Sequence, residues 1–237
     1  MPVDKPRQLM RSWQANAEAW TRVVREQCLP SRRLVTDAAV LDAIAECAPR
    51  RVLDVGCGEG WLCRALAASG IEVLGVDASR PLILQARAAD PYAQRYHELG
   101  YDQLAEAGQA LGKFDLLVCN FALLEEDLLP SLKAMRSRAT DAGLLLIQTL
   151  HPWQACASQP YVDGWRVESF SDFGNEFTQP MPWFFRTLQS WLALLAEAGW
   201  QLQWLQEPKQ PQQVQPASML LLLRAQAEPG SEQPGAG

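Results

Sequence analysis

Residues 52–61 read VLDVGCGEGW, an apolar run that ends in three closely spaced glycines. The run predicts a buried strand, and the apolar stretch that starts at Trp61 predicts a helix. Glycines between a strand and a helix allow a tight turn and let a ligand approach the main chain closely. The free N–H groups at the start of the helix suit an anionic group. The stretch therefore predicts a ligand-binding loop at the carboxyl end of a strand.

A carboxylate follows this glycine loop. The stretch EVLGVD ends in Asp77, about twenty residues after the loop, where nucleotide-binding folds place an acid that binds ribose hydroxyls. The plainer interpretation is that the glycines only form a turn and that Asp77 caps the next helix. The order of strand, loop, helix, strand and acid favours nucleotide binding. The dehydrogenase fingerprint G-x-G-x-x-G is disfavoured, because Trp61 stands at its third glycine.

Strand and helix signals alternate on both sides of the loop. This alternation predicts an α/β fold, doubly wound, with a mostly parallel sheet covered by helices on both faces. The region 151–186 does not follow this alternation. It is rich in aromatic residues and shows no clean periodicity. The expected strands are 51–56, 72–79, 95–99, 114–120, 143–150, 201–206 and 218–225.

Two helical segments are expected before the first strand. In residues 12–26, Trp13 and Trp20 fall on one helical face, with Ser12 as N-cap. The second helix starts near Thr36. We expect a helical cap over residues 1–48, a main domain over 49–225 with an inserted lid over 151–187, and a flexible tail over 226–237.

The composition fits one α/β domain with additions. The chain has 237 residues, of which 48% are hydrophobic and 20% charged. The net charge of −6 argues against a nucleic-acid partner, since such proteins usually carry a basic face. Arginines do cluster near the N-terminus, and we interpret most of them as solvated helix faces. These are Arg22, Arg25, Arg32 and Arg33.

Targeting signals are missing from the sequence. The start lacks the apolar core of a signal peptide, and no apolar run is long enough to span a bilayer. The six cysteines show no metal-like spacing, so we expect apolar core thiols in a reducing compartment and no metal site. We therefore expect a cytoplasmic protein without a membrane partner, either a monomer or a homodimer.

Three segments carry a resemblance to a known family. Residues 52–66, 73–79 and 114–127, in this order, resemble the first, second and fourth signature segments of class I S-adenosylmethionine-dependent methyltransferases. The resemblance covers about Arg50 to Leu150. It implies a Rossmann-like, seven-stranded sheet whose last strand runs antiparallel, with an N-terminal helical cap and an aromatic lid. It also implies S-adenosyl-L-methionine as cofactor, with S-adenosyl-L-homocysteine as product.

The same resemblance assigns roles to the glycine loop and its carboxylates. Gly56, Gly58 and the backbone near Gly60 would receive the methionine portion of the cofactor. Asp54 would order the loop and the amino group of the cofactor. Asp77 would hold the ribose hydroxyls.

Two further contacts are implied at the adenine end. Ala78 would lie beside the adenine. The third segment departs from the family pattern, because Gly100 stands where an acidic residue often contacts the adenine amino group. Tyr101 and Asp102 are the neighbours that would replace that residue.

At the methionine end, Asn120 and Phe121 would line the transferable methyl group. An aromatic face near a sulfonium is physically favourable, although ordinary packing explains Phe121 equally well. Arg32 or Arg33 would pair with the cofactor carboxylate through a charge-assisted fork. Surface solvation is the alternative for both arginines.

The methyl acceptor is less well defined. His151, directly after the fifth expected strand, is a candidate catalytic base, or else it shapes the turn before Pro152. An aromatic lid suits a planar or apolar small molecule. The candidate substrate residues are Trp153, Trp165, Phe185 and Arg186.

Other acceptors remain open. Amino-directed nucleic-acid methyltransferases typically carry [D/N]-P-P-[aromatic] after the fourth strand, whereas residues 120–123 read NFAL. A protein or RNA acceptor and a non-catalytic cofactor-binding protein remain as alternatives. The sequence favours a small-molecule methyltransferase.

Overall fold

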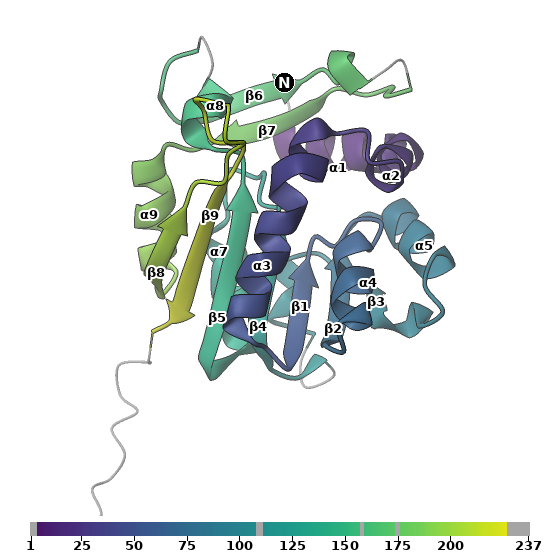
Figure 1. Cartoon of the computed structure of the whole chain (residues 1–237), viewed down its shortest axis with the longest axis vertical. Coiled ribbons are helices and arrows are strands. Elements are labelled where there is room, and N and C mark those ends of the chain that lie inside the picture. Colours follow the sequence, from purple (N-terminus) through teal and green to yellow (C-terminus); the bar gives the residue numbers. More distant parts are fainter. Residues whose placement is uncertain (1–3, 108–110, 157–158, 174–175, 227–237) are drawn as a thin grey trace, which may run out of the picture.

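The computed structural model of the chain describes residues 4–107, 111–156, 159–173 and 176–226. Its centre is a seven-stranded sheet with the strand order β3-β2-β1-β4-β5-β9-β8 (Figure 1). These strands are β1 (Arg51–Val55), β2 (Glu72–Asp77), β3 (Tyr96–Glu98), β4 (Phe114–Asn120), β5 (Ala139–Thr149), β8 (Trp200–Gln206) and β9 (Met219–Ala225).

The strand directions confirm the expected fold class. The pairs β1–β2, β1–β4, β2–β3 and β4–β5 are parallel. Strand β9 is antiparallel to both β5 and β8, so the last strand of the chain is the one that runs against the others. Because parallel strands end at one edge, the residues that follow β1, β2 and β4 meet there. The strand order reverses between β1 and β4, which is where open α/β sheets bind ligands.

Alternate residues of each strand build two core layers, as expected for a sheet covered on both faces. On one face, Val52 and Leu116 pack with residues of three helices; on the other, Leu53 and Leu117 pack with residues of two. None of the helices in the described ranges is long and apolar enough to cross a membrane. The helices of the first face are α3 (Asp37–Cys47), α4 (Trp61–Ala68) and α5 (Arg80–Ala88), and those of the second are α7 (Leu129–Arg138) and α9 (Leu188–Glu197).

The N-terminal helices differ from the expectation. Two helices, α1 (Lys5–Ala15) and α2 (Ala17–Arg25), replace the single one predicted over 12–26. Ser12 is not an N-cap. It lies buried within α1, which starts earlier because the Asp4 carboxylate accepts a hydrogen bond from the Arg7 main-chain N–H at 3.1 Å. A short π-helical turn, η1 (Arg32–Thr36), then runs directly into α3, so Thr36 makes no side-chain cap.

The predicted lid region contains a hairpin that the sequence did not indicate. Strands β6 (Gly164–Glu168) and β7 (Met181–Phe185) pair antiparallel and lie across the edge toward which the parallel strands point (Figure 1). Aromatic residues occupy both faces of this hairpin, so no polar alternation marked it. Helix α9 is capped by Thr187, whose side chain accepts from the Ser190 main-chain N–H. The remaining short elements are α8 (Pro152–Cys156), η2 (Ala93–Arg95), η3 (Asp102–Leu104) and η4 (Ser171–Phe173). Residues 227–237 of the expected tail lie outside the described residues.

The N-terminal helices and the lid share a small apolar core. Leu9 of α1 packs in one cluster with Phe170 and Met181 of the lid, and with Leu124, which follows β4. Helix α1 also packs against β7. Together they form a roof over the carboxyl edge of the sheet.

Asn16, between α1 and α2, fastens this roof. Its side-chain amide donates to the Gln179 carbonyl at 2.7 Å, and its carbonyl oxygen accepts from the main-chain N–H of Thr178 at 2.9 Å. Asn16 is buried, with 1% of its surface exposed. Because a buried amide is costly unless its hydrogen bonds are made, this residue fixes the register between cap and lid.

We expect Asn16→Ala to lower the free energy of unfolding by about 1–3 kcal/mol, because it removes the hydrogen bonds that the buried amide makes to the main chain of Thr178 and Gln179. Urea unfolding measures the change. Gln14→Ala, an exposed position in the same helix, is the matched control. Equal stability of the two variants would contradict this account of the roof.

Candidate functional site

The loop between β1 and α4 has a main chain that only glycine adopts easily. Gly56, Gly58 and Gly60 all have positive φ, at 78°, 56° and 83°. A Cβ at Gly60 would lie 2.7 Å from the Tyr96 ring, and one at Gly56 would lie 2.4 Å from the Ala122 Cβ. At Gly58, by contrast, no atom of the described chain lies within 4 Å of such a Cβ. The loop is thus packed on both sides of an open position at Gly58.

Asp77, at the end of β2, closes this loop. One carboxylate oxygen accepts from the Gly58 main-chain N–H at 2.9 Å, and the other accepts from the Ser79 main-chain N–H at 2.7 Å. Burial raises the pKa of Asp77, and these two hydrogen bonds oppose the rise. Ser79 occupies the N-cap position of α5, but its side chain makes no capping hydrogen bond. Each carboxylate oxygen has a further lone pair for a ligand.

Asp54, in β1, lies buried beneath the loop with 2% of its surface exposed. The Cys63 thiol donates to its carboxylate at 3.4 Å. Burial is the main reason that the pKa of Asp54 is raised to about 7. Because burial destabilises the ionised form of this carboxyl, a cationic group placed near it would stabilise the carboxylate.

Tyr101 connects the segments that follow β3 and β4. Its hydroxyl donates to the Ala122 carbonyl at 3.2 Å and lies 2.5 Å from where a Gly56 Cβ would stand. Burial raises the pKa of Tyr101 well above its ordinary value, so the hydroxyl stays a donor. Asp102 is exposed, and Ala78 is partly exposed at the end of β2.

Asn120 and Phe121 stand at the end of β4. The Asn120 side-chain oxygen is buried and has no hydrogen-bond partner within the described residues. Phe121 has a φ of 54°, and its main-chain N–H donates to the Gln148 carbonyl at 2.8 Å. A positive φ at a bulky residue is a strained conformation, of the kind that clusters at functional sites. The structure therefore brings Asp54, Asp77 and Asn120 to one edge of the sheet.

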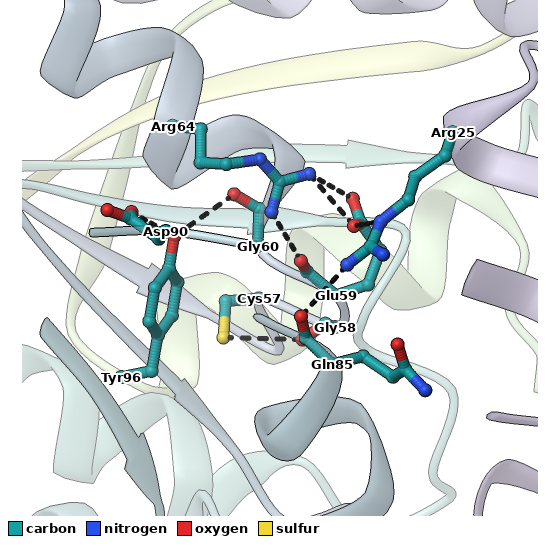
Figure 2. A network of polar contacts seen from close by, with 9 residues as sticks. All are labelled: Arg25, Cys57, Gly58, Glu59, Gly60, Arg64, Gln85, Asp90 and Tyr96. Carbon is teal, nitrogen blue, oxygen red and sulfur yellow. Dashed lines mark hydrogen bonds and ion pairs between the residues drawn. The ribbon is translucent and has the colours of Figure 1, made fainter. Parts of the chain in front are cut away.

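A buried ion-pair network joins the loop to the N-terminal helices (Figure 2). Glu59 is 1% exposed and accepts from the Arg25 Nε at 2.7 Å and from the Arg64 Nη2 at 2.8 Å. Arg25 stands on an exposed helix face, with 36% of its side chain accessible, yet its guanidinium also donates to the Gln85 carbonyl at 2.9 Å. The signal for this network was a charged residue inside a loop otherwise built of glycine and cysteine. Arg22 likewise forms an ion pair, with Glu176 of the lid.

Arg32 and Arg33 have different surroundings. Arg32 pairs with Asp37 at 2.9 Å and lies 4.8 Å above the Trp61 ring, at the start of α4. Arg33 is exposed. Arg32 is thus the one of the pair that lies beside the helix following the glycine loop.

Both ring nitrogens of His151 make contacts. Nδ1 accepts from the Trp153 main-chain N–H at 3.2 Å, and Nε2 lies 2.8 Å from a Glu207 carboxylate oxygen. The first contact requires an unprotonated Nδ1, so the neutral ring carries its proton on Nε2 and donates to Glu207. This arrangement shapes the turn after β5. A role for His151 as a base stays a prediction.

Of the four candidate substrate residues, two line a cavity and two do not. Phe185 and Arg186 line a small, mostly apolar cavity with Leu123, Thr149 and Trp183, at the ends of β4 and β5. Trp153 is 52% exposed. Trp165 stacks edge-on against Phe184, and its indole nitrogen donates to the Glu126 carboxylate at 3.0 Å.

Arg186 holds the segment after β4 in place. Its guanidinium donates to the main-chain carbonyls of Glu125 and Glu126. Burial lowers the pKa of Arg186 to about 10, so it keeps its charge at neutral pH. The cavity therefore has one cationic group in its wall.

Known proteins share this sequence pattern and this fold. The family described as a methyltransferase domain matches residues 31–204. The ubiquinone biosynthesis O-methyltransferase of Ralstonia nicotianae is 33% identical over 122 residues, which cover 47% of this chain and 49% of that protein. The enzyme of the same name from Alkalilimnicola ehrlichii is 35% identical over 86 residues, 33% of this chain and 34% of that protein. The matches thus span between a third and a half of these relatives.

A solved structure matches nearly the whole chain. It is the 1,6-didemethyltoxoflavin-N1-methyltransferase of Burkholderia thailandensis, crystallised with 1,6-didemethyltoxoflavin and S-adenosylhomocysteine. The TM-score is 0.65 at 18% identity, and the match covers 96% of this chain and 93% of that one. The two proteins share a fold.

The buried Asp54 carboxyl should make stability depend on pH. Its pKa is 3.8 in an ordinary setting and about 7 in the folded chain, so the folded state binds this proton more tightly. Its contribution to the free energy of unfolding therefore falls as the pH rises from about 4 to about 7. Asp54→Asn removes the titration.

We expect the wild type to lose stability relative to Asp54→Asn between about pH 5 and about pH 7.5, as measured by urea unfolding. A stability difference that stays constant across this range would show that the carboxyl does not titrate there.

Proposed function

The chain belongs to the methyltransferase domain family, and we propose that it is an S-adenosylmethionine-dependent methyltransferase that acts on a small molecule. One observation carries the proposal. The Asp77 carboxylate closes a glycine loop whose middle position is open, at the edge of the sheet that the cap and the lid cover. A ligand at this edge meets the open main chain of Gly58 and a carboxylate together.

The polar groups at the edge suit the proposed cofactor. The ribose hydroxyls are donors, and the Asp77 carboxylate has lone pairs to accept from them. The amino group of the methionine portion is cationic, and the partnerless Asn120 oxygen and the buried Asp54 carboxyl are acceptors for it. Gly58, where the position of a Cβ is open, gives the methionine portion close access to the main chain, whereas Gly56 is packed against Ala122 and Tyr101.

Bound S-adenosylmethionine would supply an electrophilic methyl group on its sulfonium, to be taken up by a lone pair of the acceptor with S-adenosylhomocysteine as the leaving group. The chain itself positions the acceptor and excludes water. Asn16 and the shared apolar cluster hold the roof, and Arg186 fixes the segment after β4. The Phe121 ring, at the end of β4, would face the sulfonium with its electron-rich surface.

The acceptor would lie beneath the hairpin, beside a cavity of about 10 Å³ that by itself has room only for about one water. Phe185 supplies an apolar wall there, and Arg186 supplies charge. The names of the relatives from Ralstonia nicotianae and Alkalilimnicola ehrlichii support a small-molecule acceptor. We keep His151, which follows β5, as the candidate base.

The wider assignments are proposals of the same kind. We propose a cap over residues 1–48 and a cofactor-binding domain over 49–225 that carries the lid at 151–187. A cytoplasmic location is supported by the six cysteines, all free thiols. The net charge of −6 favours a small-molecule partner over nucleic acid. A monomer or a homodimer is compatible with this site.

Calorimetric titration with S-adenosylhomocysteine tests the cofactor assignment, with NADH as a parallel ligand. We expect only the former to bind. Asp77→Ala should weaken its binding by about 1.5–3 kcal/mol, because charged hydrogen bonds to the ribose are lost. Asp141→Ala, an exposed carboxylate near the start of β5, is the matched control and should bind normally. Equal affinity of the two variants would mean that the ribose lies elsewhere.

The acceptor class has its own test. The wild type is incubated with methyl-labelled S-adenosylmethionine and a cell extract separated into low-mass, protein and RNA fractions. We expect label in the low-mass fraction, and less of it with Asp77→Ala at a limiting concentration of S-adenosylmethionine. Label confined to protein or RNA would contradict the small-molecule assignment. Binding without any transfer would favour a non-catalytic protein.

A further inference from the structure

Glu59 is a buried charge in the glycine loop. Its carboxylate is 1% exposed and accepts hydrogen bonds from two guanidinium groups, those of Arg25 and Arg64 (Figure 2). A buried carboxylate is unfavourable unless it is paired and hydrogen-bonded. The loop can therefore keep Glu59 in this position only while cationic partners stay in place.

The two arginines come from different parts of the chain. Arg64 belongs to α4, which directly follows the loop, and it also donates to the main-chain carbonyl of Glu59 at 2.6 Å. This pair therefore lies within one loop-and-helix unit. Arg25 stands at the end of α2, and its second contact is the Gln85 carbonyl of α5 at 2.9 Å. Arg25 thus joins the N-terminal helices to the loop and to the helix that follows Asp77.

The position of Glu59 matters for the ligand-binding main chain. It lies between Gly58, whose N–H binds Asp77, and Gly60, whose Cα faces the Tyr96 ring. These two glycines do little to hold Glu59 in place, because a glycine main chain is free to adopt many conformations. Through its ion pair with Arg25, the side chain of Glu59 therefore connects the position of α2 to the conformation of the loop.

The N-terminal helices have a second attachment on their other side. Asn16 binds the lid at Thr178 and Gln179. The cap thus touches the lid at one end of α2 and the glycine loop at the other. Docking of the cap and ordering of the loop are connected through a helix of nine residues.

We propose that Arg25 is a positioning residue for the cofactor site, which orders the glycine loop through Glu59 only when the N-terminal helices are docked. The inference rests on the proposed function. It makes closure of the cap and cofactor binding mutually reinforcing, since each stabilises the same loop conformation. Arg25 itself does not touch the cofactor.

Binding of S-adenosylhomocysteine to four variants tests this coupling. Arg25→Met should weaken affinity about tenfold, within the usual range for coupled sites. Glu59→Gln, which also weakens the pair with Arg64, should weaken it at least as much, and the double variant should be no worse than Glu59→Gln alone, because the link to Arg25 is already lost there. Arg25→Lys should recover part of the affinity. Arg11→Met, an exposed arginine of α1, is the matched control and should leave affinity unchanged.

Hydrogen exchange separates positioning from simple stability. In the wild type, S-adenosylhomocysteine should slow amide exchange both in β2 and in α2. In Arg25→Met, at saturating ligand, protection should persist in β2 and disappear from α2. A purely structural role predicts a lower melting temperature with unchanged affinity and unchanged protection of α2, and that result overturns the proposal.

The outcomes remain distinguishable from those of the proposed function. A wild type that fails to bind S-adenosylhomocysteine refutes the cofactor assignment and this inference with it. A wild type that binds, with Arg25→Met binding equally well, refutes the inference alone. If Glu59→Gln does not fold, as judged by circular dichroism, the Arg25 variants carry the test.

Discussion

The hydrogen bond from the Gly58 main-chain N–H to the Asp77 carboxylate is the contact on which the site depends. It joins the loop after β1 to the end of β2, and it requires a main chain with three positive φ values in five residues. Neighbouring groups leave no room for side chains at Gly56 and Gly60. The open position thus faces the carboxyl edge of the sheet, with a carboxylate beside it.

A site on the open edge of a sheet would be exposed to water, and the rest of the chain covers it. The cap and the lid share an apolar core, and Asn16 fixes their register. Methyl transfer needs alignment and exclusion of water more than it needs acid–base groups. This explains why an aromatic hairpin, with buried arginines at Arg166 and Arg186, is a suitable cover for the proposed acceptor.

Most of the fold could be predicted from local sequence patterns. Strands β1, β2, β4 and β5 are continuous apolar runs, and the glycine loop with Asp77 has a spacing that specific ligand chemistry demands. Contacts between residues that are far apart in the sequence leave no such pattern. The break at Asn16 and the pairing of Arg25 with Glu59 both depend on tertiary partners. A surface arginine and one that neutralises a buried carboxylate look alike in sequence.

A crystal structure of the chain with S-adenosylhomocysteine tests the central claim most directly. The account predicts the ribose hydroxyls on the Asp77 carboxylate, the methionine portion along Gly56 and Gly58, and the N-terminal helices docked above. A ligand bound away from this loop, for instance in the hollow beside Pro49 and Asp115 at the opposite edge of the sheet, would contradict it.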